Sequence, residues 1–507
     1  MVSGPAAHQP VRVRVRPGVG LVVVGPRTVP DPAADPGSSG RGGRRVGLVT
    51  ALHSAAGQRL PPLLAAMGDA DPREAPAARL TEAMKTELLP RLAEEGAFGE
   101  GWRLEGVRVE PIAGLGKDHW ASTTLTTAVD LRRGSETRSE ALVAKWMLPS
   151  DGFEGFMLTD LQASNEIKMY TEVFPFMERL AEGSGVPVGD LHPKHYLAAL
   201  SPVKDTMSLT LMEDLRAKGF RLTKERTALD RQHANLVLRS LGRLHALSHA
   251  AKARCRGEFL EEVTPLLREV AFLPEWSDRW SFTLGSCFRR GLDRLSSRLD
   301  ADQHRRRLDG LRRLEDIADD VYSIMLGAAA RTEPAGVLVH GDFNRNNMQF
   351  RYNELGEPVE VRFFDFQNCR YCSPSVDLSF FLFMNTSPEL RRQHWDDLLQ
   401  EYFGSMTSAL DRLLEGHEVH EDFVRPTLQG VRDDLKQHAL WGYVICSFFL
   451  PQMAGAPEDV PDMEEMKDKA TSDPATVVAI MCAIGGEEAT EGLADMLLEY
   501  IDRDLVP

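Results

Sequence analysis

The sequence predicts an α+β protein with two lobes, one built on a small antiparallel sheet and the other mainly helical. Strand-like apolar runs dominate from about residue 81 to Asp214, and apolar residues then recur at helical spacing. The helical half contains one exception, in which runs at 348–352 and 359–364 flank the turn residues 353–356. We therefore expect the helical lobe to carry one β-hairpin.

The amino-terminal segment differs from the rest of the chain. Its first 60 residues hold eight arginines, no lysine and only two acids, Asp31 and Asp35, among many prolines and glycines. Such a segment cannot bury enough apolar surface to offset the entropy of ordering it, so residues 1–78 are predicted to be a disordered extension. Mitochondrial transit peptides are also arginine-rich and acid-poor, but five prolines between positions 10 and 32 would break the amphipathic helix that such a peptide needs.

The small lobe is predicted to span residues 79–213. A helix precedes the sheet, and the order after it is strand, loop, strand, strand, helix, strand. These elements are expected at residues 81–95 (helix), 102–111, 123–131 and 142–147 (strands), 161–174 (helix, closed by Pro175) and 209–212 (strand). This order is typical of the small lobe of a protein-kinase-like fold, with one key helix inside the sheet region.

The larger lobe is predicted to span residues 214–507. One helix is expected at 236–248, where apolar residues recur at i, i+4 and i+7, and His245 on that helix is interpreted as a hydrogen-bonded core residue. The longest apolar run, 440–450, stops at Pro451 and is too short to cross a membrane. We expect it to be a buried helix.

The composition is that of an ordinary soluble protein, with 43% hydrophobic and 26% charged residues. A formal net charge of −16 argues against nucleic acid or an anionic membrane surface as the main partner, although a local cluster of lysine, Mg²⁺ and N–H groups would still bind phosphate. Six irregularly spaced cysteines suit a reducing compartment, and a cytoplasmic protein is expected. Cys369 and Cys372 form an isolated C-x-x-C pair with no second pair nearby to complete a zinc site.

Three polar residues stand at the ends of the strand-like runs around the hairpin. Asp342 and Asn347 lie in HGDFNRNN, after the apolar residues 338–339, and Asp365 follows the second hairpin strand. A hairpin brings its two ends together, so these side chains are expected to converge. One carboxylate that accepts a hydroxyl proton, with an amide oxygen and a carboxylate suited to Mg²⁺, is the set that phosphoryl transfer from ATP requires. The alternative, in which Asp and Asn only form turns, fits any one of the three alone.

A lysine and a glutamate of the small lobe are expected to hold the phosphates. Val143 and Lys145 point to the same face of a strand, where Val143 would cover the adenine and Lys145 would reach the α- and β-phosphates. On the following helix Glu166 shares a face with apolar neighbours, and a carboxylate at an apolar interface needs a partner. Lys145 is that partner in this interpretation, and two unrelated surface charges are the alternative.

Two further segments are expected to contact the nucleotide. A loop between two predicted strands should lie over the phosphates, although it lacks the spacing of a P-loop. The run 211–215 ends the last small-lobe strand and is predicted to be a hinge whose backbone pairs with the adenine edge, an ordinary strand end being the alternative. The residues expected to bind the nucleotide are Gly114, Gly116 and Ser122 in the loop and Met212, Glu213, Asp214 and Leu215 in the hinge.

Two polar residues are expected to support the catalytic loop. His340 is interpreted as a brace for this loop and not as a reacting group. Asp377 begins an apolar helix, where it would either cap the helix or tie down the loop before it.

These motifs resemble the ecdysteroid kinase-like family, also called CHK kinase-like, a branch of the aminoglycoside phosphotransferase and choline kinase group. The resemblance covers roughly residues 100–455 and is strongest in HGDFNRNNMQF, FFDFQNCRYCSPSVDLSFFL and LMEDL. It implies a protein-kinase-like fold and an ATP- and Mg²⁺-dependent kinase. The implied acceptor is a hydroxyl group of a small molecule, such as an ecdysteroid or a xenobiotic alcohol.

The resemblance also assigns roles, and it exposes departures from the family pattern. The residues it places in the site are Asp342 as the base, Asn347 and Asp365 as Mg²⁺ ligands, and Lys145 with Glu166 as the phosphate-binding pair. Lys117 stands where the family has glycine and His119 where it has asparagine, and a β-carbon at position 117 can push the loop away from the phosphates. Cys372 replaces another common glycine.

Three other functions share parts of this pattern. A choline or ethanolamine kinase would use the same catalytic residues, but its acceptor site would need carboxylates and aromatic rings around a cation. A catalytically inactive kinase-like protein could sequester a ligand, and the altered phosphate loop is the feature that points to it. A protein kinase is disfavoured because no Ala-Pro-Glu segment follows Asp365.

Overall fold

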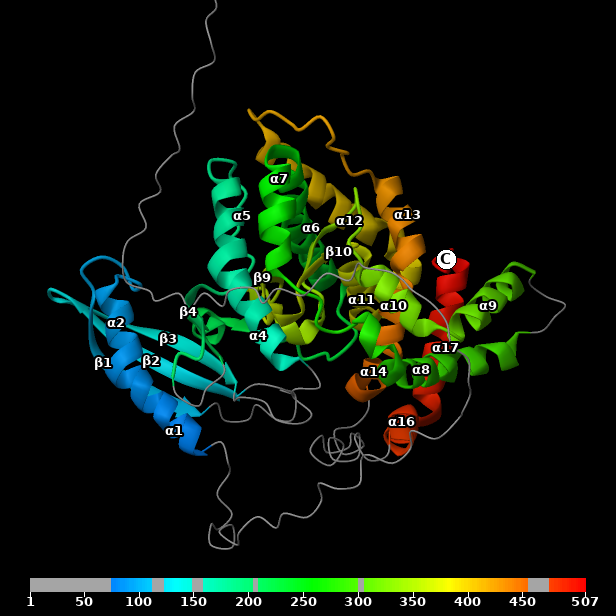
Figure 1. Ribbon diagram of the computed structural model, residues 1–507, viewed down its shortest axis with the longest axis horizontal. Helices are drawn as coiled ribbons and strands as arrows, with labels where there is room; N and C mark the ends of the chain where they lie inside the picture. Colours follow the sequence, from blue (N-terminus) through cyan, green and yellow to red (C-terminus); the bar gives the residue numbers. More distant parts are fainter. Residues whose placement is uncertain (1–73, 112–122, 148–157, 204–207, 300–304, 455–473) are drawn as a thin grey trace, which may run out of the picture. The chain divides into compact units, whose positions relative to one another are not determined.

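The computed structural model describes residues 74–507 except for 112–122, 148–157, 204–207, 300–304 and 455–473 (Figure 1). These described residues belong to one compact unit, Ala70–Pro507. The expected phosphate loop, with Gly114, Gly116 and Ser122, and residues 1–73 of the expected extension lie outside the described residues.

An antiparallel sheet forms the amino-terminal part of this unit, with the strand order β1-β2-β3-β5-β4. Its strands are β1 (Arg103–Pro111), β2 (Thr123–Arg133), β3 (Glu136–Met147), β4 (His195–Leu200) and β5 (Ser208–Glu213). Four of them agree with the sequence prediction. The prediction lacks β4, because HYLAAL has neither the alternation nor the β-branched residues that indicate a strand.

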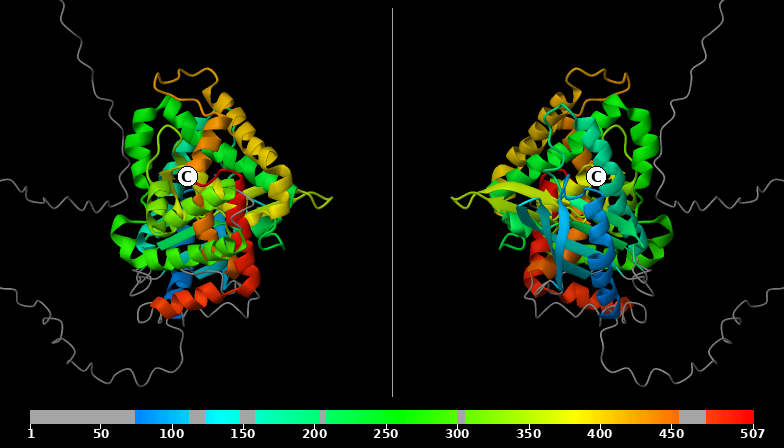
Figure 2. Two further views of the ribbon diagram at one scale, coloured as in Figure 1. Left: turned by 90° about the vertical axis from the view of Figure 1, so that its right-hand side faces the viewer. Right: turned by 90° about the vertical axis from the view of Figure 1, so that its left-hand side faces the viewer.

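One face of the sheet is covered by the first helical segment, α1 (Glu74–Ala83), η1 (Met84–Leu88) and α2 (Leu89–Glu94), which runs along β1 to β3 (Figure 2). Leu142, Ala144 and Trp146 of β3 are buried in this interface. The alternating Val143 and Lys145 are only half-buried and lie on the other face, as the period of two predicts. The expected helix at 81–95 is confirmed. It begins at Glu74, so residues 74–78 are helical although the sequence predicts that they belong to the disordered extension.

Two prolines that the sequence predicts to end helices lie inside them instead. α4 (Thr159–Lys168) continues through the π-helical turn η2 (Met169–Val173) into α5 (Phe174–Ala181). The π turn interrupts the regular bonding just before Pro175, which makes this proline a first-turn residue whose missing N–H breaks no helical bond. α14 (Leu440–Ala454) likewise continues past Pro451, which lies in its last turn.

The rest of the described chain is mainly helical. α6 (Arg231–Arg254) packs against α12 (Pro388–Leu414) so closely that a β-carbon on Gly242 would lie 2.5 Å from the Tyr402 carbonyl oxygen. The remaining helices and turns are η3 (Leu215–Lys218), α7 (Arg256–Glu258), η4 (Phe259–Val263), η5 (Thr264–Leu266), η6 (Pro274–Trp276), α8 (Ser277–Arg298), α9 (Arg305–Ala318), α10 (Val321–Ala329), η7 (Arg345–Asn347), η8 (Phe366–Asn368), α11 (Ser375–Asn385), α13 (Leu428–His438), α16 (Pro474–Ala483) and α17 (Gly486–Asp502).

Short strands within the helical part carry the expected hairpin. β8 (Met348–Tyr352) pairs with β9 (Pro358–Phe363), and β6 (Phe220–Arg221) extends this sheet beside β8. A second, two-stranded sheet joins β7 (Val337–Val339) to β10 (Arg370–Cys372). The segments before and after the hairpin are therefore fixed to each other by β7 and β10.

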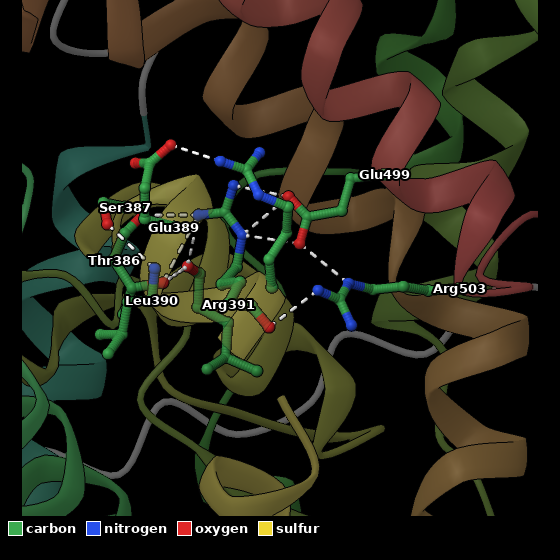
Figure 3. A network of polar contacts seen from close by, with 9 residues as sticks. Thr386, Ser387, Glu389, Leu390, Arg391, Glu499 and Arg503 are labelled. Atoms are coloured by element: carbon green, nitrogen blue, oxygen red, sulfur yellow. Dashed lines mark hydrogen bonds and ion pairs between the residues drawn. The ribbon is translucent and has the colours of Figure 1, made fainter. Parts of the chain in front are cut away.

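A buried arginine fastens the carboxy-terminal helix α17 to the start of α12 (Figure 3). Nε and Nη2 of Arg391 donate to Glu499 at 2.9–3.1 Å, and its Nη1 donates to the carbonyl oxygens of Leu382 and Thr386. Arg503 completes the cluster by donating to Glu499 Oε1 at 2.8 Å and to the Arg391 carbonyl oxygen at 2.8 Å. The sequence prediction contains no part of this network.

The described architecture confirms the α+β prediction, with a five-stranded antiparallel sheet followed by a mainly helical part that holds a β-hairpin. None of the described helices combines the length and the apolar character that crossing a membrane requires.

Candidate functional site

The hairpin brings three of the predicted site residues together. Asp342 follows β7, Asn347 precedes β8, and Asp365 follows β9. The Phe364 N–H donates to the Asn347 carbonyl oxygen at 3.0 Å, which extends the hairpin ladder to the edge of the site. Asn347 Nδ2 donates to Asp342 Oδ2 at 2.8 Å, and the Asp365 charge acts on Asp342, so the three side chains converge as the sequence predicts.

The loop that carries Asp342 is held by Asp377 of α11. Its carboxylate accepts the backbone N–H groups of His340 at 2.7 Å and Gly341 at 2.9 Å, so Asp377 ties down the loop, the second of its two expected roles. His340 is hydrogen-bonded to the Phe364 carbonyl oxygen at 3.0 Å, which supports its expected bracing role. Gly341 has φ +81°, and a β-carbon there would lie 2.0 Å from a backbone oxygen, so only glycine fits.

Two amide side chains fix the orientation of the Asp342 carboxylate. Asn344 Nδ2 donates to Oδ1 and Asn347 Nδ2 donates to Oδ2, both at 2.8 Å. Burial raises the pKa of Asp342, the charge of Asp365 raises it further, and His340 and the two amide donors oppose the shift. A carboxylate with a raised pKa is a stronger base than an ordinary one, which suits it to accept a hydroxyl proton. Asn344 is missing from the sequence prediction.

Lys145 connects the sheet, α4 and the segment after the hairpin. Its Nζ lies 2.8 Å from Glu166 Oε2 and 2.6 Å from Asp365 Oδ1. Burial acts to lower the pKa of Lys145, but the two carboxylates outweigh it and the pKa is raised. The lysine therefore stays protonated at every physiological pH, and the predicted contact between Lys145 and Glu166 is present.

Glu166 is only partly satisfied by this contact. Its Oε1 is buried and has no hydrogen-bond partner among the described residues. Burial raises the pKa of Glu166, Lys145 opposes the shift, and Asp365 adds to it. The cluster therefore holds more carboxylate than cation, which destabilises it in the absence of a further positive group.

Asn165, the neighbour of Glu166 on α4, holds the segment after Asp365. Its Nδ2 lies within 2.8–3.3 Å of the carbonyl oxygens of Arg268, Gln367 and Cys369, and its Oδ1 accepts the Arg268 N–H at 3.0 Å. The sequence prediction lacks this residue, because its partners are backbone atoms more than 100 residues away. An asparagine on an apolar helix face was the only signal available.

Asp365 and Asn347 are the residues whose free oxygen atoms suit a metal ion. The side-chain nitrogen of Asn347 donates to Asp342, so its amide oxygen can face a metal ion. Lys145 donates to Oδ1 of Asp365, so Oδ2 can do the same. Among the described residues, no three His, Cys, Asp or Glu side chains are grouped to hold a metal. Mg²⁺ bound to a nucleotide takes only one or two protein oxygens and fills its other positions with phosphate and water, so this pair fits it.

The hinge residues occupy the end of β5 and η3. The Glu213 carboxylate accepts the Lys194 N–H at 2.9 Å and pairs with Arg362 and Lys218, and Asp214 pairs with Arg216 at 2.8 Å. These carboxylates are therefore engaged in holding the hinge. Met212 lies opposite Val143 of the neighbouring strand β3. The contacts of this hinge with a nucleotide base stay predictions.

Comparison with known proteins adds the following. A family model described as the ecdysteroid kinase-like family matches residues 116–415, more than half of the chain. Among solved structures, the chain is similar to ADP-bound aminoglycoside phosphotransferase APH(2'')-Ib at 14% identity, over 70% of this chain and 99% of that one. Its TM-score of 0.26 is too low to support any conclusion about the site. No curated protein matches the chain.

Proposed function

The chain belongs to the ecdysteroid kinase-like family, and from this premise we propose that it transfers the γ-phosphate of ATP to a hydroxyl group of a small molecule. The acceptor class we propose is an ecdysteroid-like or xenobiotic alcohol, and the compartment is the cytoplasm. The observation that carries the proposal is the position of Lys145 Nζ, 2.8 Å from Glu166 and 2.6 Å from Asp365, where a protein-kinase-like site requires it.

In this proposal Asp342 is the catalytic base. Its two carboxylate oxygens are held by Asn344 and Asn347, so the group keeps one orientation toward the incoming hydroxyl. Asp342 takes the hydroxyl proton while the hydroxyl oxygen forms a bond to the γ-phosphorus, and the bond from that phosphorus to the bridging oxygen of ADP breaks. Asp377 holds the loop and would thereby keep the base at a constant distance from the phosphates.

The small-lobe residues position the nucleotide. Lys145 would exchange one carboxylate contact for the α- and β-phosphates, and Glu166 would keep the lysine in place. Asp365 and Asn347 would hold Mg²⁺, which when bound neutralises charge that develops between the β- and γ-phosphates. Met212 and Val143 would cover the adenine.

Two measurements test the proposal. Mg·ATP should raise the melting temperature of the full chain, and ATP should be consumed in the presence of hydroxylated sterols. A panel that also contains choline and ethanolamine separates the acceptor classes, because consumption with the amines alone would replace the steroid proposal by an amine kinase. A chain that shows no thermal shift with Mg·ATP contradicts the kinase proposal as a whole.

The role of Asp342 is tested separately. We expect Asp342→Ala to keep the Mg·ATP thermal shift and to lose turnover by a factor of roughly 10²–10⁴. The matched control is Asp396→Ala, which removes an exposed carboxylate of α12 and should leave turnover unchanged. Product formation by Asp342→Ala at the wild-type rate would refute its role as the base.

A further inference from the structure

Two cysteines far apart in the sequence lie side by side in the carboxy-terminal part of the chain. Cys287 is on α8 and Cys482 is near the end of α16, and their Sγ atoms are 3.8 Å apart. The two helices pack against each other (Figure 1). Cys287 and Cys482 are both free cysteines in the structure.

Hydrogen bonds from one arginine help to hold the two thiols close together. Arg290, one turn after Cys287 on α8, donates to the carbonyl oxygens of Ile484 at 3.0 Å and Gly486 at 2.6 Å, and to Thr490 Oγ1 at 2.9 Å. These bonds hold the turn that directly follows Cys482. The separation of the sulfur atoms is therefore set by backbone anchoring as well as by the rotamers of the two cysteines.

The two thiols are unequal in exposure and in acidity. Cys287 is 1% exposed, whereas Cys482 is half-buried and can meet a small solute. The hydrogen bond from Cys287 lowers the pKa of Cys482 to about 7, burial opposes the shift, and the Arg290 charge adds to it. The same hydrogen bond and burial raise the pKa of Cys287. Such a pair, one accessible acidic thiol beside one protected thiol, is typical of peroxide-sensitive cysteines.

We propose that Cys482 and Cys287 form a peroxide-sensitive pair that closes to a reversible disulfide between α16 and α8. The Cys482 thiolate attacks one peroxide oxygen, so that an S–O bond forms and the O–O bond breaks, and the departing hydroxide takes a proton to become water. Cys287 then attacks the resulting sulfenic sulfur, which forms the S–S bond and breaks the S–O bond. The Cys287 proton leaves with that hydroxyl as a second water molecule, and the peroxide has accepted the two electrons that the thiols lose.

The closure needs only a small movement. A disulfide requires a sulfur separation of about 2.05 Å, so the two atoms must approach by less than 2 Å from their present distance. The bond would link residues 195 positions apart and would hold α16 on α8. Because the expected compartment is reducing, the bond would be a transient modification and not a permanent structural element.

The experiment treats the reduced wild-type chain with hydrogen peroxide, alkylates the remaining thiols and maps the peptides by mass spectrometry. We expect a peptide pair joined through Cys287 and Cys482, an intact mass lower by two hydrogen atoms, and full reversal by dithiothreitol. Because this test uses the wild-type chain, it does not depend on whether any variant folds. Unmodified thiols at both positions, or a bond mapped to Cys369 and Cys372 instead, would overturn the proposal.

Variants then test the order of the steps. Cys287→Ser should stop the reaction at the sulfenic acid, which dimedone traps on Cys482, whereas Cys482→Ser should abolish both the adduct and the bond. Cys446→Ser, which removes a buried thiol of α14, is the control and should oxidise like the wild type. Iodoacetamide should label Cys482 increasingly as the pH rises through about 7, and Cys255, whose pKa is raised by burial, only at higher pH. A dimedone adduct on Cys287 and not on Cys482 would contradict the assigned order.

Discussion

Two charge clusters join distant parts of this chain, and they are built in opposite ways. Around Arg391, two guanidinium groups share the carboxylate of Glu499, and the Arg391 donors also meet backbone carbonyl oxygens. Around Lys145, one ammonium group faces the carboxylates of Glu166 and Asp365, and one oxygen of Glu166 is without a partner in the described part of the chain. In the first, which we call the saturated cluster, every charge has a partner. The second, which we call the open cluster, has one positive charge for two carboxylates.

This difference is the one expected between a structural cluster and a cluster that receives a ligand. A saturated cluster gains nothing from a further ion, so its value lies in fastening α12 to α17. A half-buried cluster with excess carboxylate gains from any cation that enters, which is what a site for metal-bound nucleotide requires. The predictions below break each cluster in turn.

The largest effect is expected at the saturated cluster. Arg391→Met leaves Glu499 buried with only Arg503, so the free energy of unfolding should fall by about 3–5 kcal/mol in urea denaturation. The control is Arg392→Met, the next residue, whose exposed pair with Glu389 should contribute about 0–1 kcal/mol. Equal losses in the two variants would show that the Arg391 network is not a fastening point.

At the open cluster, Lys145→Met should lower kcat/KM by roughly 10²–10³ in a coupled ATPase assay with an acceptor. The reason is that the α- and β-phosphates of ATP lose the ammonium group proposed to bind them. The variant leaves two carboxylates close together without a cation. Added Mg²⁺ should therefore restore part of the melting temperature that Lys145→Met loses relative to the wild type, whereas it should not raise the melting temperature of Arg391→Met. Lys168→Met, which removes an exposed lysine of α4, is the matched control. A Lys145→Met variant that retains wild-type kcat/KM would contradict the assigned position of the phosphates.

A smaller effect is expected at Asn165, which links the open cluster to the segment after it. Asn165→Ala should lower the free energy of unfolding by about 1–3 kcal/mol, since buried backbone carbonyl oxygens lose their donor. Asn165→Asp keeps the oxygen that accepts the Arg268 N–H but removes the N–H donors. Comparing it with Asn165→Ala therefore separates the contribution of the accepted bond from that of the donated bonds. If neither variant is less stable than the wild type, Asn165 does not hold this segment.

The smallest effect concerns pH. The folded-state pKa of Asp342 lies above its ordinary value, so protonation favours the folded chain, and that contribution is lost as the pH rises through the raised pKa. His192, whose burial lowers its pKa to about 4, acts in the opposite direction on acidification. We therefore compare melting temperatures of wild type and Asp342→Asn between pH 7.5 and 5. The wild type should gain stability relative to the variant as the pH falls, and parallel curves would contradict the shift.

Local patterns account for what the sequence predicts correctly. The hairpin and the convergence of Asp342, Asn347 and Asp365 follow from turn residues and strand ends within one short stretch, and Lys145 follows from a period of two. These features depend on neighbours in the chain, so one sequence is enough to find them.

Features that depend on distant partners escape the same reasoning. The partner of Arg391 is 108 residues away, and Asn165 contacts backbone atoms, which have no residue type to recognise. Pro175 is misinterpreted because the π turn before it is a property of the packed helix and has no sequence signal of its own. The roles assigned to the site residues stay predictions until the variants above are measured.

Adjacent residues of α4 act on two sides of the proposed nucleotide site. Glu166 reaches the lysine of the sheet, while Asn165 holds the segment that carries the proposed metal ligand. A rotation of this one helix would disturb both contacts at once. Under the proposed function, nucleotide binding and the position of the proposed metal-binding segment would therefore be coupled reciprocally. A small molecule that displaces α4 would then inhibit the proposed kinase reaction without contacting ATP or the acceptor.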